Sequence, residues 1–274
     1  GLTVGNFAGM QADQIAALPA IDIANLSASV IAALTTAQVA ALGLSQIAAL
    51  TTLQAASLNS ANVYGLQTDQ VASLELVDLR AMVTQAFASL TEAQVVALTT
   101  AQYRGLNMEN LAAMSTLQIR SLELADLAVL STANLQALSS RQIAVLTTDQ
   151  VASLTSAQAL GLSSANLRAL ATFQVAALST SALAFVTTTN LQTLASAQTA
   201  ALTTDQVLAL TTRQIAGLST SNLRALTSTQ VSAVGVAQLV ALSSLQVRAL
   251  AVGQSASLGT TQIAALLSAQ AQAL

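Results

Sequence analysis

The chain has 274 residues, of which 54% are hydrophobic, 2% aromatic and only 7% charged. Ordinary globular domains contain about 25% charged residues. Eight arginines and eleven acidic residues give a net charge of −3, and Lys, His, Cys and Trp are absent. The composition therefore excludes disulfides, Cys or His metal sites, Ser-His-Asp or Cys-His nucleophile systems and Schiff-base lysines. Eight scattered arginines also do not form the basic stripe that a nucleic-acid binder needs.

A leucine row with a period of eight organises the whole sequence from Leu2 to Leu274. All 35 positions of this row are apolar, and 30 of them are Leu. The exceptions are Met10, Met82, Met114, Val186 and Val234. The chain therefore consists of 34 octads without an insertion or deletion. Each octad is expected to stack on its neighbours in a fixed register.

Each octad repeats the same pattern of residue types, here numbered 1 to 8 from the leucine. A representative octad, residues 34–41, reads LTTAQVAA. Positions 2 and 3 are usually Thr or Ser, and position 6 is usually Val, Ile or Leu. Position 5 is Gln in 21 octads, Asn in seven and Asp in three. We expect positions 1 and 6 to be buried, positions 4 and 7 to face water, and position 5 to have a structural role.

The pattern predicts one very short helix in each octad. A continuous helix would rotate the leucine row by about 80° per octad, because eight residues exceed two helical turns. A strand face needs a period of two, whereas positions 1 and 6 have opposite parity. Ala, Leu and Gln are good helix formers. The expected fold is an all-α, tightly wound solenoid whose helices span about six to seven residues each.

Capping residues and charges place the helix boundaries at the same point of every octad. Thr35 and Gln38 have the spacing of a capping box, which recurs in many octads. The only proline, Pro19, lies at position 2, where the helices are expected to break. Acidic residues at position 4 and arginines at position 7 fit the helix dipole. These residues are Asp13, Asp69, Asp149 and Asp205, and Arg80, Arg104, Arg120, Arg168, Arg224 and Arg248.

A longer period is nested in the octads. Asn replaces Gln at position 5 in octads that begin blocks of six or seven, at Asn6, Asn62, Asn110, Asn166 and Asn222. The sequence thus predicts a single continuous repeat array over residues 1–274, divided into blocks 2–57, 58–105, 106–161, 162–217 and 218–273. Two explanations remain open for the spacing of 56 residues. A seven-octad segment has been duplicated, or seven octads match a whole number of solenoid turns.

No group of residues indicates a catalytic, cofactor or metal site, so we expect no enzyme activity. The pairs Glu75/Asp78 and Glu123/Asp126 are interpreted as caps of their octads, because no acidic cluster has the spacing of a calcium loop. The six aromatic residues are too few for a stacking surface and are interpreted as core or groove fillers. They are Phe7, Tyr64, Phe87, Tyr103, Phe173 and Phe185. Polar residues interrupt every apolar run, so we expect no membrane insertion.

Octads such as LTTAQVAA and LTTDQVAS resemble the long octapeptide arrays of large bacterial surface or secreted proteins, which are often labelled adhesion or haem-utilisation proteins. The resemblance covers the whole chain and implies a repeat stalk or fibre at the cell surface or outside the cell. The haem label has no support in this sequence, because neither His nor Cys is present as an axial ligand.

These observations favour a structural scaffold, a rigid extracellular stalk or a filament-forming surface protein. Because the terminal octads lack a polar capping repeat, we expect either end-to-end association with a second copy of the chain or continuation into more repeats. The alternative is a binding module, in which the Thr/Ser rows on one face of the solenoid recognise a glycan, ice or a protein. No nucleic-acid partner and no cofactor are expected.

Overall fold

The computed structural model describes residues 4–274, and its chain divides into two compact units, Gly1–Ala137 and Leu138–Leu274. Both units consist of short helices, and the described residues contain no strand. Each described octad contributes one helix, which confirms the predicted all-α solenoid with one helix per repeat.

The helices of the first unit all begin at position 3 of their octad. They are α1 (Val4–Ala8), α2 (Ala12–Ala16), α3 (Ala20–Ala24), α4 (Ala28–Ala32), α5 (Thr36–Ala40), α6 (Leu44–Ala48), α7 (Thr52–Ser57), α8 (Ser60–Gly65), α9 (Thr68–Ser73), α10 (Leu76–Ala81), α11 (Thr84–Phe87), α12 (Glu92–Ala97), α13 (Thr100–Gly105), α14 (Met108–Ala113), α15 (Thr116–Ser121), α16 (Leu124–Val129) and α17 (Thr132–Ala137).

The helices of the second unit begin at the same octad position. They are α18 (Ser140–Ala144), α19 (Thr148–Ala152), α20 (Ser156–Gly161), α21 (Ser164–Ala169), α22 (Thr172–Ala177), α23 (Thr180–Phe185), α24 (Thr188–Leu191), α25 (Ser196–Ala200), α26 (Thr204–Ala209), α27 (Thr212–Gly217), α28 (Thr220–Ala225), α29 (Ser228–Ser232), α30 (Val236–Val240), α31 (Ser244–Arg248), α32 (Val252–Ala256), α33 (Thr260–Ala265) and α34 (Ser268–Ala271).

Capping at position 2 starts each helix, and extended backbone separates it from the one before. In α12 the N-cap Thr91 has φ −72° and ψ 162°, and its hydroxyl accepts a hydrogen bond from the backbone N–H of Gln94. After the helix, Leu98 has φ −60° and ψ 133°. Because positions 1 and 2 are extended, the helices have four to six residues, slightly fewer than predicted. No described residue has a positive φ, so the corners need no glycine.

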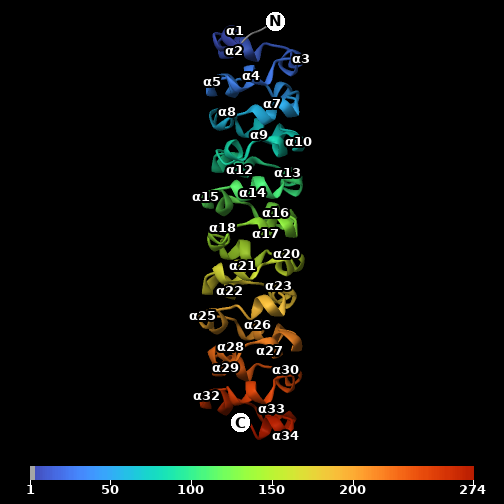
Figure 1. Cartoon of the computed structure of the whole chain (residues 1–274), viewed down its shortest axis with the longest axis vertical. Helices are drawn as coiled ribbons and strands as arrows, with labels where there is room; N and C mark the ends of the chain where they lie inside the picture. The colour runs from blue at the N-terminus through green and yellow to red at the C-terminus, as the bar shows by residue number, and fades with distance from the viewer. Residues whose placement is uncertain (1–3) are drawn as a thin grey trace. The chain divides into compact units, whose positions relative to one another are not determined.

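The solenoid has three helices per turn, because each helix packs against the third one along the chain. In the first unit α2 packs against α5, α5 against α8 and α8 against α11, and in the second unit α22 packs against α25. Helices related in this way are called a column below. Figure 1 shows α5 and α8 following each other along one side of the first unit, and α22 and α25 doing so in the second.

The three-helix turn bears on the spacing of 56 residues. Seven octads are not a multiple of three, so blocks of seven do not correspond to whole turns. The explanation by whole turns is therefore wrong within each unit. Duplication of a seven-octad segment stays as the interpretation of the longer period.

Positions 1, 5 and 6 form the interior. Position 6 is fully buried in most octads, as at Val95 and Ile215, and the leucine row is at most a few per cent exposed through most of the chain. The amide at position 5, such as Gln94, is also buried. Isolated helices this short are unstable in water, so their stability comes from this packing between turns.

Small residues at position 8 allow helices in a column to approach closely, and Gly65 is the tightest case against backbone. A Cβ at Gly65 would lie 2.7 Å from the carbonyl oxygen and 2.8 Å from the Cα of Thr36, in the helix one turn earlier. By contrast, a Cβ at Gly5, which is also helical, meets no atom within 4 Å.

We predict that Gly65→Ala lowers the free energy of unfolding by about 1–3 kcal/mol, because the backbone of α5 must move away from the new methyl group. Gly5→Ala is the control and should raise it by about 0.5–1 kcal/mol through the helix preference of alanine. Urea unfolding followed by circular dichroism measures both. If both substitutions raised the free energy of unfolding by the same amount, α5 and α8 would not approach as closely as described.

Candidate functional site: the amide ladder and the exposed rows

The side-chain amides at position 5 link each turn of the solenoid to the turn before it, and we call this series the amide ladder. In α26 the Gln206 Oε1 accepts a hydrogen bond from the backbone N–H of Thr203 (2.8 Å). Its Nε2 donates to the carbonyl oxygens of Val175 (2.9 Å), Ala176 (3.2 Å) and Leu178 (2.7 Å). One side chain thus joins the start of α26 to the end of α22 and to Leu178, which leads into α23, the helix one turn earlier.

This geometry satisfies backbone groups that a short helix leaves without partners. The first N–H groups and last C=O groups of any helix have no partner within it, and in helices of four to six residues these are most of the backbone. The same bonds recur at Gln54, which contacts Ile23 and Leu26, and at Gln254, which contacts Leu223 and Leu226. The predicted structural role of position 5 is confirmed, and the amide has both functions, the cap and the bond to the neighbouring turn.

Asparagine at position 5 makes fewer bonds between turns because its side chain is shorter. Asn62 Nδ2 donates to the carbonyl of Leu34 (2.6 Å), and Asn134 Nδ2 donates to that of Leu106 (3.0 Å). The apolar neighbour Leu135 at position 6 is fully buried. Leucine follows five of the seven asparagines at position 5, and this longer apolar neighbour is consistent with filling of one packed layer.

The hydroxyl of Tyr103 makes a hydrogen bond that the amide ladder lacks at Asp126. By the spacing of the ladder, a glutamine at position 126 would reach the carbonyl of Val95, which lies 31 residues earlier. The Tyr103 hydroxyl donates to that carbonyl instead (2.7 Å). Burial raises the pKa of Tyr103, so the hydroxyl stays protonated and able to donate. A buried aromatic residue thus compensates for the missing amide.

Asp78 places a carboxylate where the ladder otherwise has a donor. Its side chain is only 2% exposed, and its Oδ1 has no hydrogen-bond partner. Burial raises the pKa of Asp78, the Thr52 hydroxyl lowers it by donating to the carboxylate, and nearby Glu75 raises it further. Burial, a threonine and a glutamate act in the same way on the pKa of Asp126.

The two Glu/Asp pairs do not act as side-chain caps, so this interpretation was wrong. Glu75 and Glu123 occupy N-cap positions, but neither side chain accepts a hydrogen bond from its helix. Glutamate is too long for the N-cap geometry that Thr, Ser and Asn adopt. The described residues contain no group of three or more acidic side chains that could hold a metal ion.

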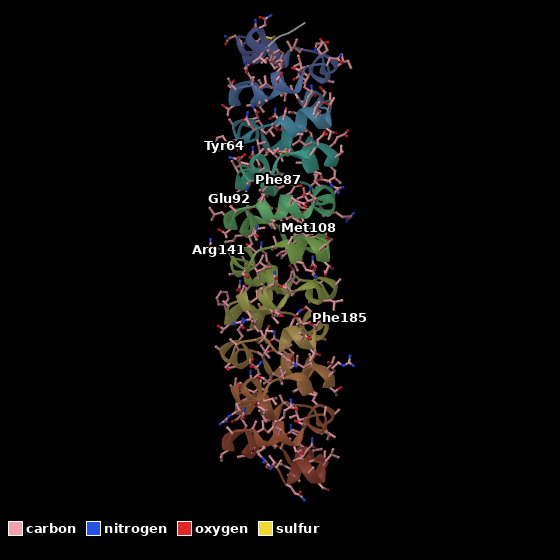
Figure 2. The ribbon with its side chains drawn as sticks, viewed as in Figure 1. Tyr64, Phe87, Glu92, Met108, Arg141 and Phe185 are labelled. Atoms are coloured by element: carbon pink, nitrogen blue, oxygen red, sulfur yellow. The ribbon has the colours of Figure 1, made fainter. Side chains whose placement is uncertain are left out.

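The aromatic residues divide between the core and the surface according to their octad position. Phe7, Phe87 and Tyr103 are buried, as predicted, but Tyr64, Phe173 and Phe185 are 66%, 61% and 54% exposed. Figure 2 shows Phe87 within the first unit, whereas Tyr64 and Phe185 lie at the outer surface. The buried ones occupy position 6, and the exposed ones occupy positions 7, 4 and 8. The expectation that all six fill the core or grooves was therefore wrong for three.

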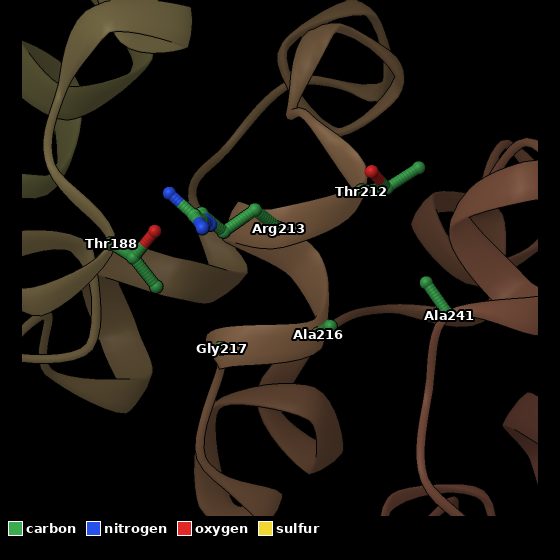
Figure 3. Close-up of a pocket in the computed structure, with 6 residues that line it drawn as sticks. All are labelled: Thr188, Thr212, Arg213, Ala216, Gly217 and Ala241. Carbon is green, nitrogen blue, oxygen red and sulfur yellow. The ribbon is translucent and has the colours of Figure 1, made fainter.

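A shallow hollow of about 500 Å³ lies on the second unit, over α24, α27 and the end of α30. In Figure 3 the side chain of Arg213 extends toward the hydroxyl of Thr188. The lining residues are Thr188, Thr212, Arg213, Ala216, Gly217 and Ala241. Arg213 is the one titratable group in this lining, so the hollow holds no acid–base pair or activated nucleophile. A similar hollow of about 560 Å³ is lined by Glu75, Leu76, Val77 and Arg80.

Charged residues lie mostly where the helix dipole favours them. Asp13, Asp69, Asp149 and Asp205 are in first turns, as predicted. Six arginines are in last turns, also as predicted. Arg213 is an exception at position 4, in the first turn of α27.

Comparison with known families identifies the repeat. The family model of the ALTTAQ repeat matches residues 15–52, 71–108 and 119–156. These three stretches carry the ALTTAQ repeat. Its motif corresponds to the octad described above, in which the Thr caps the helix and the Gln belongs to the amide ladder. A comparison with curated proteins gave no match. None of the helices in residues 4–274 has the length and apolar character needed to cross a bilayer.

We predict that Gln94→Glu lowers the free energy of unfolding by about 3 kcal/mol at neutral pH. Glutamate keeps the shape and the acceptor for the Thr91 N–H, but it cannot donate to the carbonyls of Val63 (2.8 Å) and Leu66 (2.6 Å). The control is Gln85→Glu, an exposed first-turn position where an acid is favoured. Urea unfolding should separate the two variants, and equal stabilities would contradict a donating role for Gln94.

We predict that Asp78→Asn raises the free energy of unfolding by about 1 kcal/mol at pH 7, because asparagine can donate to the preceding turn as Asn62 does. Since folding raises the pKa of Asp78, its protonated form is favoured in the fold. Its contribution to stability is full below about pH 4, the unfolded pKa, and is lost as the pH rises through the folded value. The advantage of the variant should therefore grow from about pH 4 to pH 7. An advantage independent of pH would contradict this assignment.

Proposed function

We propose that the chain is a structural repeat scaffold, part of a rigid extracellular stalk or filament, and that copies associate end to end. The observation that carries the proposal is the amide ladder. Within each unit, position-5 amides bond successive turns in the same way, so an array can be lengthened by octads without a new kind of contact. The proposal assigns no catalytic activity to the chain.

The two ends of residues 4–274 present complementary groups. At the last turn, α32–α34, Ile263 is 44% exposed although position 6 is fully buried in most other octads. The carbonyls of Ile263 and Leu266 receive no side-chain amide. In the first turns, Gln14 accepts from the N–H of Gln11 (2.8 Å), but its Nε2 makes no hydrogen bond to any described residue. An amide without a described partner near one end, and carbonyls that receive no side-chain amide near the other, fit a head-to-tail contact that repeats the amide ladder.

The proposed location at the bacterial cell surface or outside the cell rests on the resemblance of the octads to the repeat arrays of surface and secreted proteins. The absence of cysteine and lysine is compatible with this location. A long array with a repeated contact would suit a stalk or filament there.

The alternative proposal is a binding module that uses the Thr/Ser rows for a glycan, ice or a protein. Two observations weaken this alternative relative to the scaffold. The position-2 hydroxyls are engaged as caps, as Thr203 Oγ1 is with the N–H of Gln206 (3.1 Å). The rows are also divided among three columns, and in the first unit Glu75 and Glu123 interrupt the column that contains Thr51 and Thr99.

Sedimentation velocity over a concentration series, with electron microscopy of the same samples, tests the end-to-end contact. We predict assembly that grows with concentration, and a loss of at least tenfold in association constant for either Ile263→Asp or Gln14→Ala. An equal mixture of these two variants should form pairs but no longer assemblies, because each variant retains one intact end.

Leu245→Asp is the matched control, because Leu245 is 69% exposed at position 4 of α31, away from the end face. It should assemble like the unchanged chain. A strictly monomeric chain at all concentrations, or equal effects of Leu245→Asp and Ile263→Asp, would contradict the proposal.

A further inference from the structure

Three apolar side chains form an exposed strip along one column of the second unit. Leu160, Phe185 and Leu208 are 53%, 54% and 57% exposed. They lie on α20, α23 and α26, three helices that pack one on the next. Positions 7 and 8 of most other octads carry alanine, serine or arginine. We call these three residues the apolar strip.

Leu160 and Phe185 occupy positions that are neighbours across the turns. Leu160 is at position 7 of its octad, and Phe185 is at position 8 of the octad stacked on it. The same pair of positions is in contact elsewhere in this unit, where the Gln192 amide donates to the carbonyl of Gly217. Leu208 is at position 7 in the next helix of the column. Figure 2 shows Phe185 at the outer surface of the unit.

The strip is symmetric about its centre. A leucine lies one turn before Phe185 and another lies one turn after it. A twofold axis through Phe185 would bring Leu160 of one copy onto Leu208 of the partner, and each Phe185 onto its counterpart. A self-complementary patch of this kind is what an isologous interface requires.

From this arrangement we propose that two copies of the chain pair side by side and antiparallel through the apolar strip, with a twofold axis at Phe185. The contact is lateral and goes beyond the end-to-end association proposed above. The occupant of the strip is thus a second copy of this chain.

Charge favours the antiparallel pairing. Among the residues of α20, α23 and α26, only Asp205 is charged. An antiparallel pair places each Asp205 opposite α20 of the other copy, which has no charge. A parallel pair in register would place Asp205 against its counterpart, and like charges repel.

The size of the strip sets the strength of the contact. Three half-exposed side chains cover less than the about 800 Å² per partner of a standard interface. The pairing of two single copies is therefore weak, and it strengthens where copies are also joined end to end, because the second contact becomes intramolecular. A method that traps weak contacts is required to test it.

Disulfide trapping is suited to this chain because it has no cysteine of its own. Chains carrying Leu160→Cys and chains carrying Leu208→Cys, made with tags of different mass, are mixed in equal amounts and oxidised. Antiparallel pairing predicts at least tenfold more mixed disulfide than either homodisulfide, because a disulfide needs Cα atoms about 4.4–6.8 Å apart. Parallel pairing in register would instead give the homodisulfides, and random collision would give a statistical mixture.

A second substitution in both chains tests the role of Phe185. Phe185→Ser should abolish the preference for the mixed disulfide and leave a statistical mixture. Phe173→Ser should keep the preference, because Phe173 is also exposed but lies on α22 in another column. Circular dichroism checks that both variants fold. A statistical mixture or a preference for homodisulfides in the starting pair, or equal effects of the two serine variants, would overturn the proposal.

Discussion

The hydrogen bonds of the buried position-5 amide hold the turns of this solenoid together. A helix of four to six residues has few internal backbone bonds, so its free N–H and C=O groups would be a cost wherever they are buried. Gln206 satisfies both kinds at once, through its oxygen at the start of α26 and its Nε2 at carbonyls in the preceding turn. Octads without an amide at this position are therefore the places where the structure has to compensate.

The compensation takes different forms along the chain. Near Asp126 the hydroxyl of Tyr103 bonds to the carbonyl of Val95. Near Asp78 no such residue exists, and the buried Oδ1 has no partner. A chain built from one repeated contact thus contains local differences in stability, and these differences depend on pH where the amide has been replaced by an acid.

Much of the fold could be predicted from the octad, because its signals are local. The cap at Thr91, the amide at Gln94 and the apolar Val95 lie within five residues, and each has a known preference in helices. The number of helices per turn could not be predicted, since all octads are nearly alike and nothing in the sequence shows which one contacts which. The wrong prediction for the exposed aromatic residues has another cause. Residue type suggested burial for Tyr64 and Phe185, but the fully buried aromatic residues are those at position 6, and positions 7 and 8 lie outside the core.

The exchange of side-chain amide protons with deuterated solvent tests the amide ladder most directly. In a chain labelled with ¹⁵N-glutamine, NMR spectroscopy can follow the Nε2 protons of buried position-5 residues such as Gln94 and of exposed glutamines such as Gln85. Since the position-5 protons are buried and bonded to carbonyls of the preceding turn, they should exchange many times more slowly than those of exposed glutamines. Equal exchange rates at both kinds of glutamine would contradict the account.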